Sequence, residues 1–207
     1  MGRRGKLIIL SGPSGTGKST VVGKTMELRD DLCFSVSVTT RQPRPGEVDG
    51  KDYFFISREQ FDAMVKSNDL LEHATYVQNS YGTPREYVET QLDKGLNVIL
   101  DIEVQGARQV FTRMPDAITV LMLPPSIQVL RERLLSRGTE SVETVSARLK
   151  RSEQEILEAD FYRYMIINDK VENAAAQLSA IISAAHCLFD RSSVLELMEL
   201  SERNQQL

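Results

Sequence analysis

The sequence predicts an α/β fold with a parallel sheet at its centre. Short apolar runs at 7–10, 97–101, 118–123 and 164–167 are typical of strands that are buried on both faces. Helical segments separate these runs, and strands that alternate with helices form parallel sheets with right-handed crossovers. A chain of 207 residues with 41% hydrophobic content can bury a sizeable core. We therefore expect one compact unit with inserted lobes.

The first apolar run leads into a glycine-rich loop. Residues 12–19 read Gly-Pro-Ser-Gly-Thr-Gly-Lys-Ser and fit the P-loop pattern G-x-x-x-x-G-K-[ST]. Glycines let backbone N–H groups turn inward around an anion, and the helix that follows adds the positive end of its dipole. Lys18 can contact the β- and γ-phosphates of a nucleoside triphosphate, and the Ser19 hydroxyl can bind Mg²⁺. The residues expected to bind ATP are Gly12, Pro13, Ser14, Gly15, Thr16, Gly17, Lys18, Ser19 and Thr20.

Residues 35–83 differ in character from the rest of the chain and predict a strand-rich lobe. The stretch 34–39 alternates apolar and small polar residues, which indicates a half-buried strand. Two prolines within 41–47 exclude regular helix there, and 53–56 indicates another strand. Ser57-x-x-Gln60 then has the spacing of a capping box for a short helix.

The chain returns to the core through a helix that is expected to begin at Thr83. Thr83 suits the N-cap, Pro84 the first helical position and Glu86 the third position of a capping box, and Gly95 ends the helix. The next apolar run ends in Asp101. Because ligands gather at the carboxyl ends of parallel strands, Asp101 and the P-loop are expected at the same edge of the sheet.

Residues 128–158 predict a helical lid. The segment 128–151 contains six basic and three acidic side chains, in a chain whose net charge is −4, and its helical pattern breaks at Arg137-Gly138. For any single arginine a solvated helical face is the better interpretation. As a group beside a nucleotide site, these cations indicate a lid that closes over phosphates, together with the lobe on the opposite side.

Whole-chain properties exclude several classes of partner. The net charge of −4 gives no reason to expect nucleic acid or an anionic membrane, and no apolar run approaches a membrane span. Cys33 and Cys187 lie far apart and are expected to be buried, reduced thiols of a cytoplasmic protein. His186 follows helical spacing over 172–189, and with too few co-ligands for a metal site it is expected to be structural.

A P-loop alone is compatible with GTPases, motor ATPases and kinases of small molecules. The sequence lacks the N-K-x-D guanine motif of GTPases, and its length leaves little room for an oligomeric motor. It has instead a second basic and aromatic group in the lobe, made of Arg41, Arg44, Tyr53 and Tyr81. Two facing phosphate sites are what transfer between nucleotides requires, since phosphoryl transfer depends on alignment and charge neutralisation.

Seven segments, in order, resemble the guanylate kinase family. They are Ser-Gly-Pro-Ser-Gly-Thr-Gly-Lys-Ser-Thr, Val-Thr-Thr-Arg-Gln-Pro-Arg-Pro-Gly-Glu, Gly-Lys-Asp-Tyr-Phe-Phe, Leu-Glu-His-Ala, Tyr-Gly-Thr, Leu-Asp-Ile-Glu-Val-Gln-Gly and Ser-Arg-Gly-Thr-Glu. The resemblance spans about residues 6–190. It implies one kinase domain, about 5–190, that converts ATP and GMP (and also dGMP) to ADP and GDP with Mg²⁺. Its implied parts are a three-layer P-loop NTPase core (1–34, 84–127 and 159–207), a GMP-binding lobe (35–83) and a lid (128–158).

The resemblance also implies roles for individual residues. Two arginines and two phenols suit a dianionic phosphate, and the positions that match the GMP phosphate site are Arg41, Arg44, Tyr53 and Tyr81. The guanine pocket and the GMP side of Mg²⁺ match Ser37, Glu72, Thr83 and Asp101. The lid cations that meet the nucleotide phosphates match Arg133, Arg137 and Arg148, and the adenine or ribose side matches Asn168. The implied catalytic residues are Lys18, Arg41, Asp101, Arg137 and Arg148.

Several alternatives stay open at this point. Taken singly, Tyr53 and Tyr81 also suit a protein core, and Glu72 suits a solvated surface. Guanylate-kinase-like domains also occur as non-catalytic modules that bind phosphorylated peptides, although such modules lose the working P-loop. A related kinase acting on a different phosphorylated ribose would not need Glu72. The sequence has Asp101-Ile102-Glu103 where the family often has Asp-Ile-Asp, and the tail 191–207 either extends the last helix or mediates assembly into a homo-oligomer.

Overall fold

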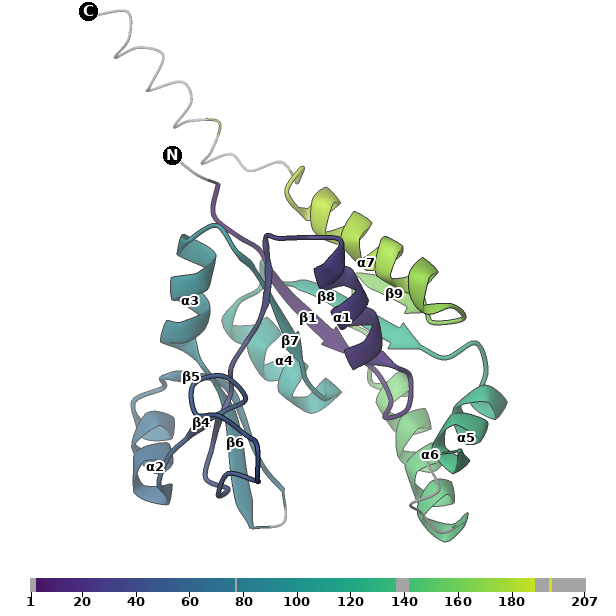
Figure 1. Ribbon diagram of the computed structural model, residues 1–207, viewed down its shortest axis with the longest axis horizontal. Coiled ribbons are helices and arrows are strands. Elements are labelled where there is room, and N and C mark those ends of the chain that lie inside the picture. Colours follow the sequence, from purple (N-terminus) through teal and green to yellow (C-terminus); the bar gives the residue numbers. More distant parts are fainter. Residues whose placement is uncertain (1–2, 77, 137–141, 189–193, 195–207) are drawn as a thin grey trace, which may run out of the picture.

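The computed structural model describes residues 3–76, 78–136, 142–188 and 194. Its centre is a five-stranded parallel sheet in the order β2-β7-β1-β8-β9. The strands are β1 (Leu7–Ser11), β2 (Leu32–Phe34), β7 (Asn97–Asp101), β8 (Ile118–Leu123) and β9 (Tyr164–Ile167). A second sheet and the helix pair α5 (Ile127–Leu135) and α6 (Val142–Leu157) lie on opposite sides of a gap below it (Figure 1).

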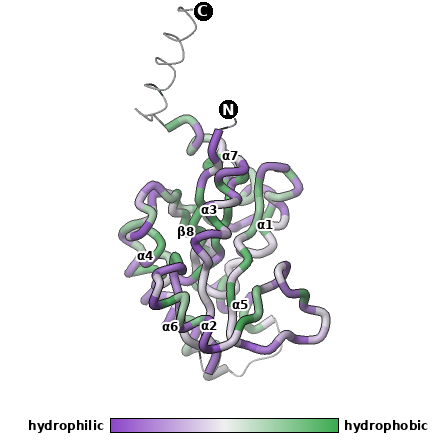
Figure 2. The backbone as a smooth tube through the Cα atoms, turned by 90° about the vertical axis from the view of Figure 1, so that its left-hand side faces the viewer, coloured by the Kyte–Doolittle hydropathy of each residue, from purple (hydrophilic) through white to green (hydrophobic). Residues whose placement is uncertain are grey.

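Helices cover both faces of the central sheet. Helices α1 (Lys18–Glu27) and α7 (Val171–Ala185) pack on one face, and α3 (Arg85–Asp93) and α4 (Val104–Arg113) pack on the other. Alternate side chains of β1 point to the two faces of the sheet. Ile8 and Leu10 belong to the cluster with α1 and α7. Leu7 and Ile9 belong to the cluster with α3 and α4. In the view turned by 90°, β8 lies between α4 and α1 (Figure 2). The predicted α/β fold with a three-layer core is confirmed.

The second sheet forms the predicted strand-rich lobe. It consists of β3 (Val38–Thr39), β4 (Phe54–Phe55), β5 (Leu70–Tyr76) and β6 (Asn79–Pro84), in the order β4-β3-β6-β5. Helix α2 (Arg58–Lys66) packs on it through Phe61. The predicted capping box is present: the Ser57 hydroxyl accepts from the Gln60 N–H, and the Ser57 N–H donates to Gln60 Oε1. The lobe therefore has its own small core.

One strand expected over 34–39 is in fact two strands in different sheets. Strand β2 ends at Phe34 in the central sheet, and β3 begins at Val38 in the lobe. The Ser35 N–H still donates to the carbonyl of Ile99 at 3.0 Å, but the Ser37 carbonyl accepts from Phe54 of the lobe at 2.9 Å. The alternation of apolar and polar residues persists across this junction, so it does not reveal the change of partner.

The expected cap of α3 at Thr83 is also wrong. Helix α3 begins at Arg85 and its N-cap is Pro84, which makes no side-chain capping bond. The Thr83 hydroxyl donates instead to Glu72 Oε1 at 2.7 Å. The Arg85 N–H, which such a cap would help to satisfy, donates to the carbonyl of Asp69 at 2.8 Å. The Thr83 hydroxyl therefore makes a tertiary contact with Glu72 in place of the expected local bond to the helix N-terminus.

The lid helices pack on one another through a small apolar cluster. Its members are Leu130 and Leu134 of α5 and Val145 and Leu149 of α6. The expected helix break at Arg137-Gly138 and the tail from 191 onward, apart from Val194, lie outside the described residues.

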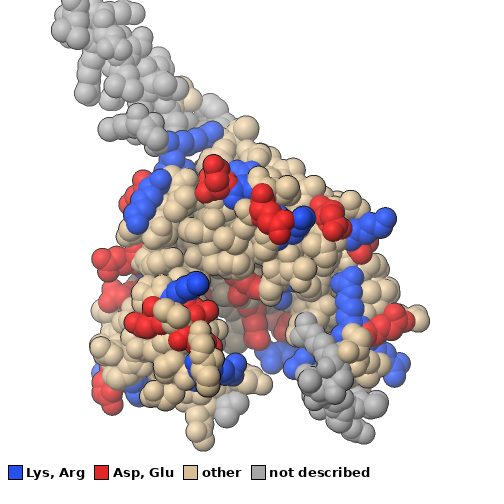
Figure 3. All heavy atoms as spheres, viewed as in Figure 1, with Lys and Arg blue, Asp and Glu red and all other residues tan. Residues whose placement is uncertain are grey.

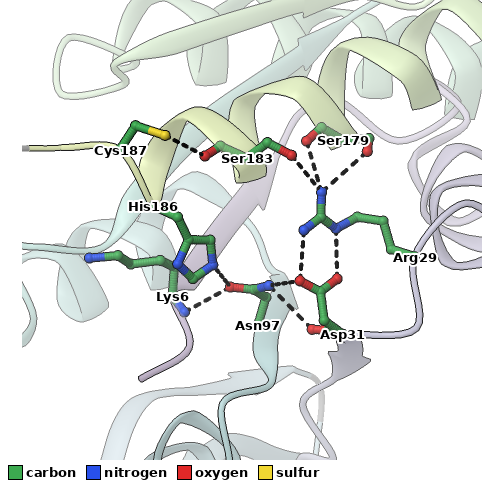
Figure 4. Close-up of polar contacts among 8 residues, drawn as sticks. All are labelled: Lys6, Arg29, Asp31, Asn97, Ser179, Ser183, His186 and Cys187. Atoms are coloured by element: carbon green, nitrogen blue, oxygen red, sulfur yellow. Dashed lines mark hydrogen bonds and ion pairs between the residues drawn. The ribbon is translucent and has the colours of Figure 1, made fainter. Parts of the chain in front are cut away.

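His186 belongs to a polar network at the end of α7 (Figure 4). Its Nε2 atom lies 2.7 Å from Asn97 Oδ1, which also accepts the Lys6 N–H at 2.9 Å. Asn97 donates to Asp31 Oδ2 at 2.8 Å, and Arg29 pairs with the same carboxylate at 2.7 Å. Because Asn97 Oδ1 is an acceptor, Nε2 carries the hydrogen. The expectation that His186 is structural is confirmed.

The two cysteines differ in exposure. Cys33 is half-buried, and burial raises the pKa of its thiol. Cys187 is exposed because it lies beyond Ala185, the last residue of α7, so the expectation of a buried thiol is wrong for this residue. None of the described helices is both long enough and apolar enough to cross a membrane.

Two exposed glycines give a matched test of backbone conformation. A Cβ atom would meet open space at both Gly23, inside α1, and Gly46, whose φ is +90°. Gly23→Ala is expected to stabilise the protein by about 0.5–1 kcal/mol, because alanine is the better helix former. Gly46→Ala is expected to destabilise it by about 1 kcal/mol, because an L side chain strains this backbone. Urea unfolding measures both, and equal shifts would contradict this account.

Candidate active site

The P-loop connects β1 to α1, and its glycines are required by its shape. Gly12 has φ +151°, and a Cβ atom there would lie 2.0 Å from the carbonyl oxygen of Met122. Gly17, at φ +86°, is the N-cap of α1 and supplies no side-chain cap. The first N–H groups of α1 therefore point into the loop without a capping side chain, which is the arrangement that binds an anion. Ser14, Ser19 and Thr20 are exposed beside it.

Lys18 and Asp101 meet at the carboxyl edge of the sheet, as the sequence predicts. Lys18 Nζ donates to the Gly12 carbonyl at 2.7 Å and lies 3.6 Å from Asp101 Oδ1. Lys18 and Asp101 lie near each other because of the strand order: β7 pairs directly with β1, which places Asp101 opposite Leu10. Burial raises the pKa of the Asp101 carboxyl, and the Lys18 ammonium acts in the opposite direction.

Arg133 and Asn168 both donate hydrogen bonds to the backbone of the P-loop. Asn168 Nδ2 donates to the Thr16 carbonyl at 2.7 Å, and Arg133 donates to the same oxygen at 3.3 Å. Arg133 also donates to the Asn168 carbonyl at 3.0 Å. Asn168 is buried, and its Oδ1 finds no hydrogen-bond partner among the described residues. Both residues thus lie at the P-loop, in contact with its backbone.

A cleft of about 440 Å³ separates the lobe from the core. Five residues predicted to bind GMP line it: Ser37, Tyr53, Glu72, Tyr81 and Asp101. A smaller adjoining pocket of about 160 Å³ includes Thr83. Figure 3 shows the surface hollowed between the lobe and the lid helices, with acidic groups in its depth. A larger cavity of about 670 Å³ lies between the lobe and α3, but none of the predicted site residues lines it.

Glu72 is buried in the wall of the cleft rather than solvated. Only 7% of it is exposed, and the Thr83 hydroxyl donates to its Oε1. Burial raises the pKa of the Glu72 carboxyl, while Thr83 and the nearby Arg113 oppose this rise. Gly106 of α4 lets the helix approach, since a Cβ atom there would lie 3.0 Å from Glu72 Oε2. Thr83 therefore fixes the orientation of Glu72.

The predicted phosphate-binding side chains gather on the lobe. The Arg41 guanidinium lies 5.5 Å from the ring centre of Tyr53, whose ring lies 6.1 Å from that of Tyr81. Arg41 is paired with Glu47 at 2.8 Å, and Glu47 also accepts the backbone N–H of Arg44 at 2.7 Å. The Arg44 side chain is exposed. Glu47 was not among the predicted site residues, although it stands in the same basic loop.

The lid contributes residues that were predicted and one that was not. Arg148 lies half-buried on α6, and Arg137 lies outside the described residues. Arg151, one turn beyond Arg148, lines the cleft between the lobe and the core and pairs with Glu103 at 2.7 Å. Its place in the basic lid segment was the only sequence signal, because its partner lies 48 positions away.

Comparisons with known proteins agree with this site. The guanylate kinase family model matches residues 4–185. The guanylate kinase of Lactococcus lactis is 49% identical over 191 residues, which cover 92% of this chain and 93% of that protein. The guanylate kinase of Oceanobacillus iheyensis is 50% identical over 188 residues, covering 91% of each. The crystal structure of guanylate kinase from Anaplasma phagocytophilum is 35% identical, with a TM-score of 0.67 over 88% of this chain and 87% of that one. Because these likenesses extend over nearly the whole chain, it belongs to the guanylate kinase family, the kinases that convert GMP to GDP.

Proposed function

We propose that this guanylate kinase transfers the γ-phosphoryl group of ATP directly to GMP in the hollow between the P-loop and the lobe. The observation that carries this proposal is the position of Asp101. Its carboxylate lies 3.6 Å from Lys18 of the P-loop and also lines the cleft that holds Glu72. One residue therefore joins the donor and acceptor sites, so that a short in-line transfer is possible without a covalent enzyme intermediate.

ATP binds through the P-loop, and Ser19 and Asp101 are the residues that would hold the accompanying Mg²⁺. The Ser19 hydroxyl, exposed in the first turn of α1, and the Asp101 carboxylate are hard oxygen donors of the kind that Mg²⁺ prefers. Mg²⁺ usually takes few protein ligands and completes its shell with phosphates and water, which fits this small donor set. When bound, it neutralises phosphate charge. Lys18 exchanges its bond with the Gly12 carbonyl for the β- and γ-phosphates.

GMP binds in the cleft with its base against Glu72. Guanine presents N1–H and N2–H₂ side by side, and an ionised carboxylate accepts from both. Thr83 holds one carboxylate oxygen of Glu72, and the Ser37 hydroxyl, which lines the same cleft, donates to guanine O6. The GMP phosphate is held by Arg41, Arg44, Tyr53 and Tyr81. Glu47 keeps the Arg41 guanidinium in place beside the two rings.

The lobe (35–83) and the lid (128–158) close over the nucleotides against the core (1–34, 84–127 and 159–207). Closure excludes water, which would otherwise take the phosphoryl group in place of GMP. Arg133, Arg137 and Arg148 bring positive charge to the phosphates as the lid closes. Arg133 and Asn168 in addition keep the P-loop in shape for the ATP phosphates and ribose.

A coupled assay of ADP formation tests the proposed reaction. With ATP and Mg²⁺, we expect turnover with GMP and dGMP, and a kcat/KM for AMP lower by about 10⁴-fold, because AMP leaves the buried Glu72 carboxylate unpaired. UMP and CMP should behave like AMP. Removing Mg²⁺ with a chelator should stop the reaction. Equal turnover of AMP and GMP would show that Glu72 does not select the base.

A further inference from the structure

Arg151 reaches from the lid into the GMP cleft. It lies on α6, and its Nη2 atom is 2.7 Å from Glu103 Oε2, at the start of α4. Both side chains line the cleft that also contains Glu72. An ion pair therefore joins a helix of the lid to the wall of the acceptor site.

This ion pair affects the relative position of α6 and α4 more than the stability of either helix. Glu103 is the N-cap residue of α4, yet its side chain makes no capping bond and points instead to Arg151. The two side chains are 56% and 68% exposed, and exposed ion pairs contribute at most about 1 kcal/mol to stability. A small free energy is sufficient to bias the relative position of two parts that move in the reaction.

The guanidinium of Arg151 is held in a fixed direction by a second carboxylate. Its Nε atom lies 3.1 Å from Oε1 of Glu155, one turn further along α6. The Glu155 side chain is only 19% exposed, so it gives the arginine a fixed partner on its own helix. Arg151 thus presents its outer nitrogen to Glu103 in a defined geometry, which a lysine could not reproduce.

From Arg151 a continuous set of contacts leads to the ATP loop. Helix α6 packs on α5 through Leu130, Leu134, Val145 and Leu149. Arg133, on the same helix α5, donates to the Thr16 carbonyl of the P-loop. The lid is therefore in contact with the acceptor cleft at one end and with the donor loop at the other.

We propose that Arg151 is a positioning residue that couples occupation of the GMP cleft to binding of ATP, by joining the lid to Glu103. This inference rests on the proposed function. GMP in the cleft fixes its wall, including Glu103, and through Arg151 it fixes α6, α5 and the back of the P-loop. The two substrates then bind with positive cooperativity, which is reciprocal: each raises the affinity of the other by the same factor.

Calorimetry tests the proposal on the full-length protein. The Kd of GMP is measured alone and with a saturating, non-hydrolysable ATP analogue and Mg²⁺, and the ratio of the two values is the coupling factor. For the parent protein we expect a factor of about 5 or more. Arg151→Gln should lower it by up to about fivefold, because an exposed ion pair is worth up to about 1 kcal/mol. Arg151→Lys should recover only part of the loss.

Three further variants distinguish the ion pair from general effects of charge. Glu103→Gln should lower the coupling factor as Arg151→Gln does, and the double variant should lower it no further, since both changes break one interaction. Lys150→Gln removes the same charge from a neighbouring exposed position of α6 and should keep the parent factor. Because both partners are exposed, high salt should reduce coupling in the parent but not in Arg151→Gln.

The outcomes distinguish this inference from the proposed function. If the parent phosphorylates GMP but its coupling factor is 1, or if Arg151→Gln keeps the parent factor, Arg151 has no such role. An equal loss in Lys150→Gln would assign the effect to the charge of α6 and would also overturn the proposal. A parent protein that neither binds nor phosphorylates GMP would refute the proposed function itself, and this inference with it.

Discussion

Lys18→Ala is expected to lower kcat by about 10²- to 10³-fold while the protein stays folded, since removing one preorganised donor to developing charge commonly costs this much. Lys18 is the cation of the P-loop, and its Nζ atom lies at the junction of the loop and Asp101. The coupled assay measures kcat. Circular dichroism and the Tm show that the fold is intact.

Lys24→Ala is the matched control, because Lys24 lies on the same helix and its ammonium pairs with Glu27 at 2.6 Å, outside the site. Its kcat should stay close to that of the parent. A folded Lys18→Ala protein with near-normal kcat would mean that ATP does not bind at this loop.

Glu72→Gln is expected to lower kcat/KM for GMP by about 10³- to 10⁴-fold, with little change in the KM for ATP. Glutamine has the same size, and its amide oxygen can still accept from the Thr83 hydroxyl, so the wall of the cleft should keep its shape. The amide nitrogen then replaces Oε2 and opposes a guanine N–H with another donor. A buried mismatch of this kind leaves both groups unsatisfied.

Steady-state kinetics with each substrate varied in turn measures this effect, and Glu59→Gln provides the control. Glu59 is exposed in the first turn of α2 on the same lobe, so its loss changes the charge of the lobe but not the cleft. It should leave both kinetic parameters unchanged. Parent-like phosphorylation of GMP by Glu72→Gln would place the guanine pocket elsewhere.

Strands β1, β7 and β8 of the central sheet could be predicted from sequence because they are buried on both faces, whereas β9 was found from its apolar run although Met165 and Ile167 are exposed. The apolar runs at Asn97–Asp101, Ile118–Leu123 and Tyr164–Ile167 coincide with β7, β8 and β9. Where only one face of a strand is buried, the alternation of apolar and polar residues was less informative. The alternation over 34–39 reports which side chains point inward, but it does not report which sheet they point into.

Site residues could be predicted where they belong to a local sequence motif. They were predicted less well where their position depends on contacts between residues far apart in the sequence. The P-loop and the position of Asp101 follow from neighbouring residues and from strand order. Thr83 has the local signal of a helix cap, but the buried carboxylate of Glu72 is the stronger partner for its hydroxyl. Arg151 and Glu103 meet only because α6 crosses beside the start of α4, which sequence spacing does not indicate.

The support of the P-loop by Arg133 and Asn168 has a consequence for how the protein is made. The nine residues from Gly12 to Thr20 emerge early in synthesis, but the side chains that bind the Thr16 carbonyl lie 117 and 152 positions further along. A nascent chain that ends before β9 therefore contains the P-loop and Arg133 but lacks Asn168, so one of the two side chains that bind the Thr16 carbonyl is missing. Contacts of such large sequence separation form late in folding, after the intervening segments have packed. The set of contacts that supports the P-loop is therefore complete only once the residues up to Asn168 have been synthesised.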